Sequence, residues 1–284
     1  MGVILVHEAK MKLVKVSFST FPDHMNPIEN LKQIREKIVL ISTKAREGHI
    51  PSALSILDLL WCLYDSVLKL RPFDQNRDVF IMSKGHASIG LYSVLAHKDL
   101  IESDALDGFA SFRSILGGHP DRNKVPFIEA STGSLGHGMP IAVGVALAKK
   151  IRHLSGSAYV LVGDGECNEG SIWESSLLAA EHQLSNLCCI VDHNHTTDRA
   201  LSIDSVADKF SSFGWETIEV DGHNHQQILA AFSHFLNRSS SKPFCIVANT
   251  IKGYGIKTME NNPEWHHKTP NEQELAVLLG EIHA

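Results

Sequence analysis

The sequence has few cysteines and no excess of basic charge, and each shortage excludes a class of protein. Its five cysteines include no C-x-x-C pair, which argues against a disulfide framework and gives a structural zinc site no support. The formal net charge is -6, and the lysines and arginines are scattered along the chain. Scattered basic charge leaves no footprint for nucleic acid or an anionic membrane, so we expect neither partner. We expect a reduced, cytoplasmic protein.

The apolar opening of the chain is too short for a signal peptide or a membrane span, because His7 and Glu8 interrupt it. We therefore expect residues 1–25 to be a loose N-terminal extension. The rest, residues 26–284, should form one large domain, since a chain that is 43% hydrophobic can bury a sizeable core.

Helix and strand patterns alternate along this domain. Residues 26–48 predict a helix, with Asn26 as N-cap, Glu29 closing a capping box and Gly48 at the end, and a second helix is expected across residues 53–68. The alternation predicts an α/β fold, a doubly wound, mostly parallel sheet with helices on both faces. The expected strands are 78–83, 158–164, 187–194, 215–220 and 244–250, and the later helices are 90–96, 135–152, 172–184 and 225–236.

Polar residues gather where the predicted strands end. Asp164 lies between two glycines after a buried apolar run, and Asn194 follows the next strand, 30 residues later. That spacing fits one βαβ unit, so the two oxygens should meet at one edge of the sheet, where hard ligands of this kind suit Mg2+ or Ca2+. Alternatively, Asp164 caps a helix and Asn194 closes a turn. The Gly-Asp-Gly frame favours a metal–diphosphate site.

The same residues carry a resemblance to a known family. GDGECNEGSIWES followed by LCCIVDHN resembles the thiamine diphosphate signature, and further motifs in the same order narrow the resemblance to the N-terminal domain of the transketolase family. The similarity spans about residues 26–270. Those further motifs are EGHIPSALS, RDVFIMSKGHAS, LGGHP, ASTGSLGHGMPIAVGVALA and NTIKGYG followed by ENNPEWHHKTP.

The resemblance implies a thiamine diphosphate-binding fold and a set of cofactor residues. The implied metal ligands are Asp164, Asn194 and the backbone carbonyl of Thr196, holding Mg2+, or Ca2+ or Mn2+ in its place, on the cofactor diphosphate. The other implied positions are Gly165 beside the diphosphate, Gly133 and Leu135 against the cofactor rings, His86 near the diphosphate and thiazolium, and Glu169 and Glu174 near a subunit interface.

The resemblance also assigns histidines to the substrate. His49, His119 and His266 match positions that face it, and with His86 they are the implied catalytic set, because imidazoles can donate to or take protons from the sugar oxygens that change charge. His193 and His195 flank Asn194 and are left open. The histidines expected on the surface or packed in the interior are His7, His24, His97, His153, His182, His223, His225, His234 and His283.

Three positions depart from the family pattern. Arg199 stands where a glycine is expected after the metal asparagine, which bears on the local turn. His267 stands where a glycine is expected after His266, and Asp121 follows the GGHP motif at a position that bears on substrate choice.

The chain ends at Ala284, before the family's second domain, which supplies the cofactor's pyrimidine pocket. We therefore expect the N-terminal subunit of a split transketolase, active only with a C-terminal partner and forming a heterotetramer with two copies of each chain. It would transfer a two-carbon ketol unit from a ketose phosphate, or a related ketose, to an aldose. The alternatives are a subunit of another thiamine diphosphate enzyme, such as a deoxyxylulose-phosphate synthase or a 2-oxo-acid dehydrogenase alpha chain, or a degenerate docking subunit.

Overall fold

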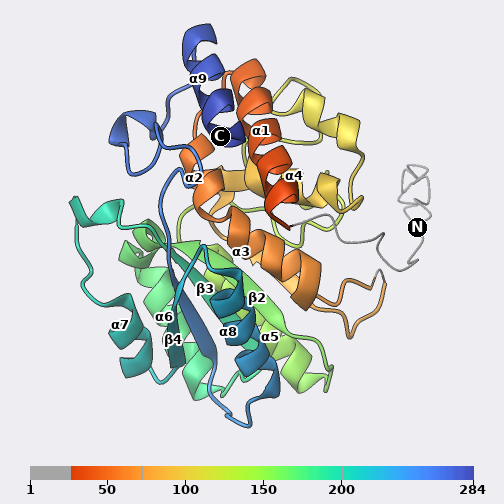
Figure 1. Ribbon diagram of the computed structural model, residues 1–284. Helices are drawn as coiled ribbons and strands as arrows, with labels where there is room; N and C mark the ends of the chain where they lie inside the picture. Colours follow the sequence, from red (N-terminus) through yellow and green to blue (C-terminus); the bar gives the residue numbers. More distant parts are fainter. Residues whose placement is uncertain (1–26, 72, 200) are drawn as a thin grey trace, which may run out of the picture.

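Five parallel strands form the sheet of the computed structural model, which describes residues 27–71, 73–199 and 201–284 (Figure 1). The strands are β1 (Val79–Met82), β2 (Ala158–Gly163), β3 (Leu187–His193), β4 (Glu216–Asp221) and β5 (Phe244–Asn249). Their order is β1-β2-β3-β5-β4, and every pairing is parallel. The carboxyl ends of β1, β2, β3 and β5 therefore lie side by side at one edge, as the sequence predicts.

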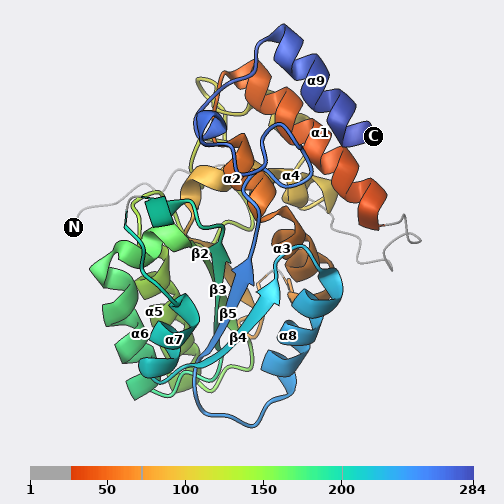
Figure 2. The ribbon, with the colours of Figure 1, turned by 60° about the vertical axis from the view of Figure 1, so that its left-hand side comes forward.

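Helices cover both faces of the sheet, which confirms the doubly wound prediction. Figure 2 shows α5, α6 and α7 on one face and α3 and α8 on the other. Alternate residues of one strand serve the two sides, since Val160 packs with the α5–α7 layer while Tyr159 and Leu161 pack with α3 and α8. The bounds are α3 (Leu57–Cys62), α5 (Gly138–Ile151), α6 (Gly170–Glu181), α7 (Val206–Ser212) and α8 (His225–Asn237).

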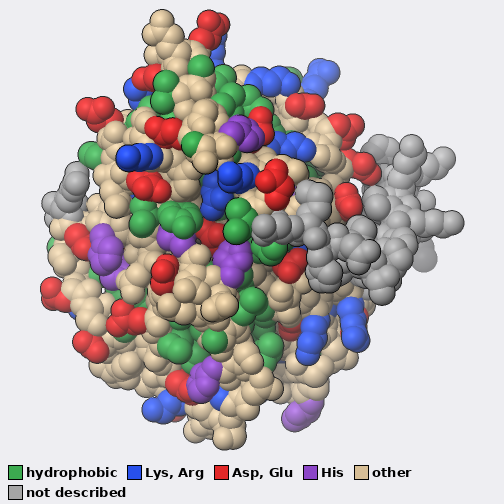
Figure 3. Space-filling view, in the orientation of Figure 1, with side chains coloured by type: hydrophobic (Ala, Val, Ile, Leu, Met, Phe, Trp, Pro, Cys, Tyr) green, Lys and Arg blue, Asp and Glu red, His purple; other side chains and the backbone are tan. Residues whose placement is uncertain are grey.

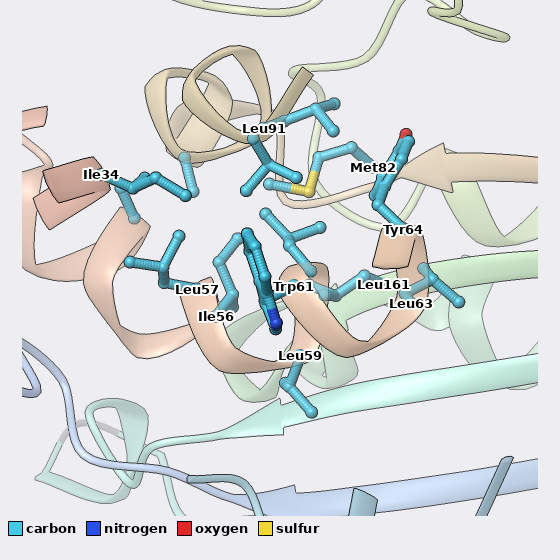
Figure 4. Close-up of a cluster of buried hydrophobic side chains, with 14 of the residues drawn as sticks. Ile34, Ile56, Leu57, Leu59, Trp61, Leu63, Tyr64, Met82, Leu91 and Leu161 are labelled. Atoms are coloured by element: carbon cyan, nitrogen blue, oxygen red, sulfur yellow. The ribbon is translucent and has the colours of Figure 1, made fainter. Parts of the chain in front are cut away.

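A second group of helices lies beyond the carboxyl ends of the strands (Figures 1 and 2). It consists of α1 (Pro27–Ala45), α2 (Ile50–Ser55), α4 (Ser88–His97) and α9 (Glu272–His283). Figure 4 shows how this group joins the sheet, with Ile34 of α1 and Leu91 of α4 packed beside Trp61 of α3 and Met82 of β1. The helical group thus covers the carboxyl edge of the sheet, where the predicted site residues lie.

Two predicted helices differ from the structure. The one expected across residues 53–68 is divided into α2, α3 and a π-helical turn (Leu63–Val67), with the break between α2 and α3 at Ile56. Just before this break, the Ser55 hydroxyl contacts the Ser52 carbonyl at 3.1 Å and the carboxylate of Asp192 at 2.8 Å. The helix expected from residue 135 begins at Gly138. The Asn26 cap and the 1–25 extension lie outside the described residues.

Figure 3 shows acidic and basic side chains interspersed on the face in view, with histidines between them. Within residues 27–71, 73–199 and 201–284, no helix combines the length and the apolar character that crossing a bilayer requires.

We expect Leu161→Ala to lower the free energy of unfolding by about 2–5 kcal/mol, because Leu161 is fully buried between the sheet and α3 and its removal leaves a cavity. Leu177→Ala is the matched control, since Leu177 is 56% exposed and its loss should change stability by about 0.5 kcal/mol or less. Urea unfolding of the isolated chain measures both. Equal losses would contradict this placement of the core.

Candidate active site at the carboxyl edge of the sheet

A buried ion pair underlies the carboxyl edge. Lys84, just after β1, contacts the carboxylate of Asp192 near the end of β3, and both side chains are almost completely buried. The same carboxylate accepts hydrogen bonds from the hydroxyls of Ser55, at 2.8 Å, and of Thr250, and from the amide of Asn194 at 3.0 Å. Burial alone would raise the pKa of Asp192, but Lys84 and these donors outweigh it and hold that pKa below its usual range.

Asp164 directly follows β2, and one of its two carboxylate oxygens has no partner among the described residues. Its Oδ1 accepts the Gly165 N–H at 2.7 Å, whereas Oδ2 is buried and has no hydrogen-bond partner among the described residues. Burial, and then the negative charge of Asp192, raises the pKa of Asp164. A buried, ionised carboxylate oxygen without a partner is unstable unless a cation meets it, so this atom fits a metal ligand.

Asn194 and Thr196 form the turn after β3, next to Asp164 because β2 and β3 are neighbours in the sheet. The Oδ1 of Asn194 accepts the Thr196 N–H at 3.1 Å and also its hydroxyl, while the amide nitrogen is committed to Asp192. The amide oxygen is therefore fixed in direction, and a metal on it would displace the Thr196 hydroxyl. The side chain of Arg199, in the same turn, lies outside the described residues.

Three of the predicted histidines come together with a fourth above this edge. The ring of His49 lies 5.1 Å from that of His86, 5.9 Å from His266 and 4.4 Å from His267, between centroids. Gly48 permits the contact, because a Cβ there would lie 2.7 Å from the carbonyl carbon of His267. Residues separated by more than two hundred positions thus share one cluster, and His267 joins His49 directly.

Three imidazoles of this cluster, those of His49, His86 and His266, have lowered pKa values and are neutral at pH 7. Burial, followed by the positive charges of neighbouring groups, lowers the pKa of His49 to about 4 and that of His86 to about 2, and burial also lowers the pKa of His266. A neutral imidazole has one N–H donor and one nitrogen acceptor. The cluster can therefore donate or accept hydrogen bonds and protons at a sugar oxygen without adding positive charge.

Lys252 supplies the positive charge that the histidines lack. Its Nζ lies 3.0 Å from Nδ1 of His266, and burial, with the charge of Lys84 next, lowers its pKa to about 8. The charges of Asp192 and Asp164 act on the same ammonium group in the opposite direction. An anion bound here would restore the full charge of Lys252.

The loop before α5 carries the predicted ring-contact residues. Gly133 has φ +153°, and a Cβ on it would lie 2.9 Å from Cδ2 of His119, so the imidazole packs on the glycine backbone. Leu135 is 44% exposed, and Ser134 and His137 on either side of it are exposed as well. Buried Glu166 fixes this loop, because it accepts the Gly136 N–H at 2.9 Å and the Gly163 N–H at 2.9 Å.

Some predicted residues lie outside this cluster. Glu169 and Glu174 are exposed at the start of α6. Nδ1 of His193 donates to Oδ1 of Asn249 at 3.1 Å, and Nδ1 of His195 pairs with Asp198 at 2.9 Å. Their rings are 4.0 Å apart.

Sequence reasoning missed Lys84, Asp192, Glu166 and Lys252. Asp192 lies within an apolar strand run, and Lys84 and Glu166 follow one by two and three positions. A charge in such a setting is itself a signal, because burying it requires a partner. Lys252 follows β5 by three positions and carried the same signal more weakly.

Comparisons with known proteins identify the family and the fold of this chain. The family described as Transketolase, thiamine diphosphate binding domain matches residues 28–280. A subunit of the apulose-4-phosphate transketolase of Phocaeicola vulgatus is 37% identical, covering 87% of this chain and 90% of that protein. A 6-deoxy-6-sulfo-D-fructose transketolase subunit of a Clostridium species is 34% identical, covering 83% and 88%. The transketolase structure of Leishmania mexicana, 27% identical, matches 92% of this chain and 42% of its own with a TM-score of 0.83.

We expect Asp164→Asn to stabilise the metal-free chain at pH 7 by about 1–3 kcal/mol, because it removes a buried charge whose oxygen has no partner. Because the pKa of Asp164 is raised in the folded chain, the protonated carboxyl group stabilises the fold at acid pH, and this stabilisation is lost as the pH rises through the folded pKa. The difference in stability between Asp164→Asn and wild type should therefore shrink toward pH 4.

Thermal unfolding at pH 4 and pH 7, with and without Mg2+ and inorganic pyrophosphate, measures this effect. The variant should lose the stabilisation that the two ligands together give to wild type. Glu174→Gln, which neutralises an exposed carboxylate, should change neither the stability of the ligand-free chain nor its stabilisation by Mg2+ and pyrophosphate. Undiminished stabilisation of Asp164→Asn by Mg2+ and pyrophosphate would contradict the ligand assignment.

Proposed function

Since this chain belongs to the transketolase family, through its thiamine diphosphate binding domain, we propose that it is the N-terminal subunit of a two-chain transketolase. The enzyme would transfer a two-carbon ketol unit from a ketose phosphate, or a related ketose, to an aldose acceptor. The observation that carries the proposal is the match to transketolase subunits over most of both chains. Human transketolase, by contrast, is matched over only 42% of its length.

The site fits thiamine diphosphate and a divalent metal. Oδ2 of Asp164 and Oδ1 of Asn194, with the carbonyl of Thr196, would hold the metal, for which Mg2+ is our choice because it prefers few protein carboxylates and completes its shell with phosphate and water. The unpartnered Oδ2 of Asp164 supports this directly. An added Cβ on Gly165 would meet nothing within 4 Å, so the backbone there leaves room for a diphosphate.

The remaining residues would divide the work of orienting the cofactor and moving protons. When bound, thiamine diphosphate supplies the carbon nucleophile for the ketose carbonyl. Leu135 and Gly133 offer an apolar side chain and a bare backbone to its rings. His49, His86 and His266, being neutral, would donate to a sugar oxygen that gains charge or take its proton. Lys252 would balance the negative charge of the bound phosphates.

An apolar surface supports a partner chain. The outer sides of α5 and α6 expose Ile141, Ile151, Leu177 and Leu178, each by 39% or more, and the acidic Glu169 and Glu174 lie beside them. Four large apolar side chains on two adjacent helices are typical of an interaction surface. We propose a C-terminal subunit that completes the pyrimidine pocket, in a heterotetramer of two copies of each chain.

The cellular setting follows the same proposal. All five cysteines are free and buried, which suits a reducing cytoplasm. We further propose that residues 26–284 act as one domain, preceded by an extension at residues 1–25 that lies outside the described residues.

We expect the isolated chain to bind Mg2+ and thiamine diphosphate weakly and to have no transketolase activity, because half of the cofactor would remain open to water. The C-terminal subunit can be obtained from the source cells by co-purification with a tagged form of this chain. Adding that subunit should restore two-carbon transfer from a ketose phosphate. The assay is run at saturating Mg2+ and thiamine diphosphate. Substantial turnover by the chain alone would overturn the two-chain proposal.

His119→Asn should lower kcat for the ketose donor by about 100-fold and change cofactor affinity far less, because a donor to a developing alkoxide acts mainly in the transition state. His153→Asn is the matched control, an exposed histidine at the end of α5. Steady-state kinetics and calorimetric titration of thiamine diphosphate separate the two effects. Similar losses in both would assign His119 a structural role through its packing on Gly133.

A further inference from the structure

Another buried carboxylate, that of Asp58, lies away from the predicted ligands and contacts two imidazoles and one guanidinium group. Asp58 of α3 is 3% exposed and contacts Nδ1 of His223 at 3.0 Å, Nε2 of His225 at 2.8 Å and Nη2 of Arg35 at 3.5 Å. Burial raises the pKa of Asp58, but the bonds from the two histidines and the charge of Arg35 outweigh it, so the carboxyl group is ionised. The Asp58 carboxylate is therefore an anion held in place near the loop that follows β5.

His223 connects Asp58 to the loop that follows β5 through two hydrogen bonds. Its Nε2 accepts the backbone N–H of Ile251 at 2.8 Å. A nitrogen that accepts must be unprotonated, so the proton lies on Nδ1 and is donated to Asp58. The ring also stacks on Tyr254, with 3.5 Å between centroids and 15° between planes. One imidazole therefore holds the segment at two points.

The segment between those points carries Lys252. Its start is fixed by the Thr250 N–H, which donates to the His193 carbonyl at 3.1 Å, and the Gly253 N–H donates to the Pro51 carbonyl at 3.0 Å. Between these tethers the side chain of Lys252 reaches His266. A shift of Ile251 would be passed directly to Lys252, its chain neighbour.

We propose that His223, oriented by Asp58, is a positioning residue that fixes residues 250–254 and thereby aims the Lys252 ammonium group into the site. The inference rests on the proposed function in one respect, namely that Lys252 faces an anionic cofactor or substrate. His225 provides a natural comparison. It bonds to the same carboxylate, but in the part of the chain that the structure describes no hydrogen bond joins it to residues 250–254.

Three conservative variants test the role of the His223 acceptor. In His223→Gln, the side-chain oxygen reaches the former Nε2 position and can still accept from Ile251. In His223→Asn, the shorter amide can donate to Asp58 but cannot reach Ile251. His225→Asn is the control, since it removes a donor from Asp58 without touching the loop.

The first measurement needs no cofactor and no partner. Hydrogen exchange of residues 250–254 and the acylation rate of Lys252 by acetic anhydride are followed on the full chain. Loss of the acceptor should speed exchange of the Ile251 amide by about tenfold or more in His223→Asn, and should change the Lys252 acylation rate. His223→Gln and His225→Asn should stay near wild type. Should His223→Asn fail to fold, Tyr254→Leu, which removes the stacking partner of the same ring, undergoes the same measurement with the same expectation.

The second measurement uses the enzyme assembled with its partner subunit. His223→Asn should raise the KM for thiamine diphosphate or ketose on the order of tenfold while kcat at saturation changes less, because Lys252 would be misplaced but not removed. Unchanged exchange and acylation in His223→Asn, or equal changes in His225→Asn, would overturn the positioning role. A wild-type enzyme without cofactor binding would instead overturn the proposed function, and the exchange and acylation results would still decide the role of His223.

Discussion

The buried pairing of Lys84 with Asp192 is the interaction on which the rest of the site depends. It joins the end of β1 to the end of β3 across β2, and the Ser55 hydroxyl and the Ser52 carbonyl bring α2 into the same network. Two charges buried without such partners would be strongly destabilising. Because Asp192 also holds the amide of Asn194, the direction of the predicted metal ligand is set by this pair.

The charges around this pair leave the edge of the sheet electrostatically incomplete. Asp164 has a buried oxygen that calls for a cation, while burial keeps His49 and His86 neutral and lowers the pKa of Lys252. A metal ion beside an anion would satisfy both deficits together, since the cation meets Asp164 and the anion meets Lys252. This complementarity supports a metal–diphosphate ligand more strongly than any one residue does.

Rigid supports surround the site at a greater distance. Glu166 binds backbone N–H groups at residues 136 and 163, and Asp58 acts on the loop after β5 through His223. Both are buried carboxylates that hold backbone, Glu166 directly and Asp58 through His223. Groups that react must be held within a fraction of an ångström, and hydrogen bonds to backbone provide that precision. The position of Lys252 relative to His266 follows from such supports.

The sequence by itself determined the architecture and the motif residues. Apolar periodicity and strand stops predicted the five strands, and the spacing of Asp164 and Asn194 placed them on neighbouring strands, because periodicity and short-range spacing are local properties. Only the tertiary structure decided the contacts between residues that lie far apart in the sequence. The hydrogen bond of Ser55 to Asp192, the contact of His49 with His267, and the roles of Asp192, Lys252 and His223 all involve partners more than a hundred residues away or on other elements. Burial and charge balance at such sites are properties of the assembled fold, because a local pattern can mark a charge in an apolar run but does not identify its partner.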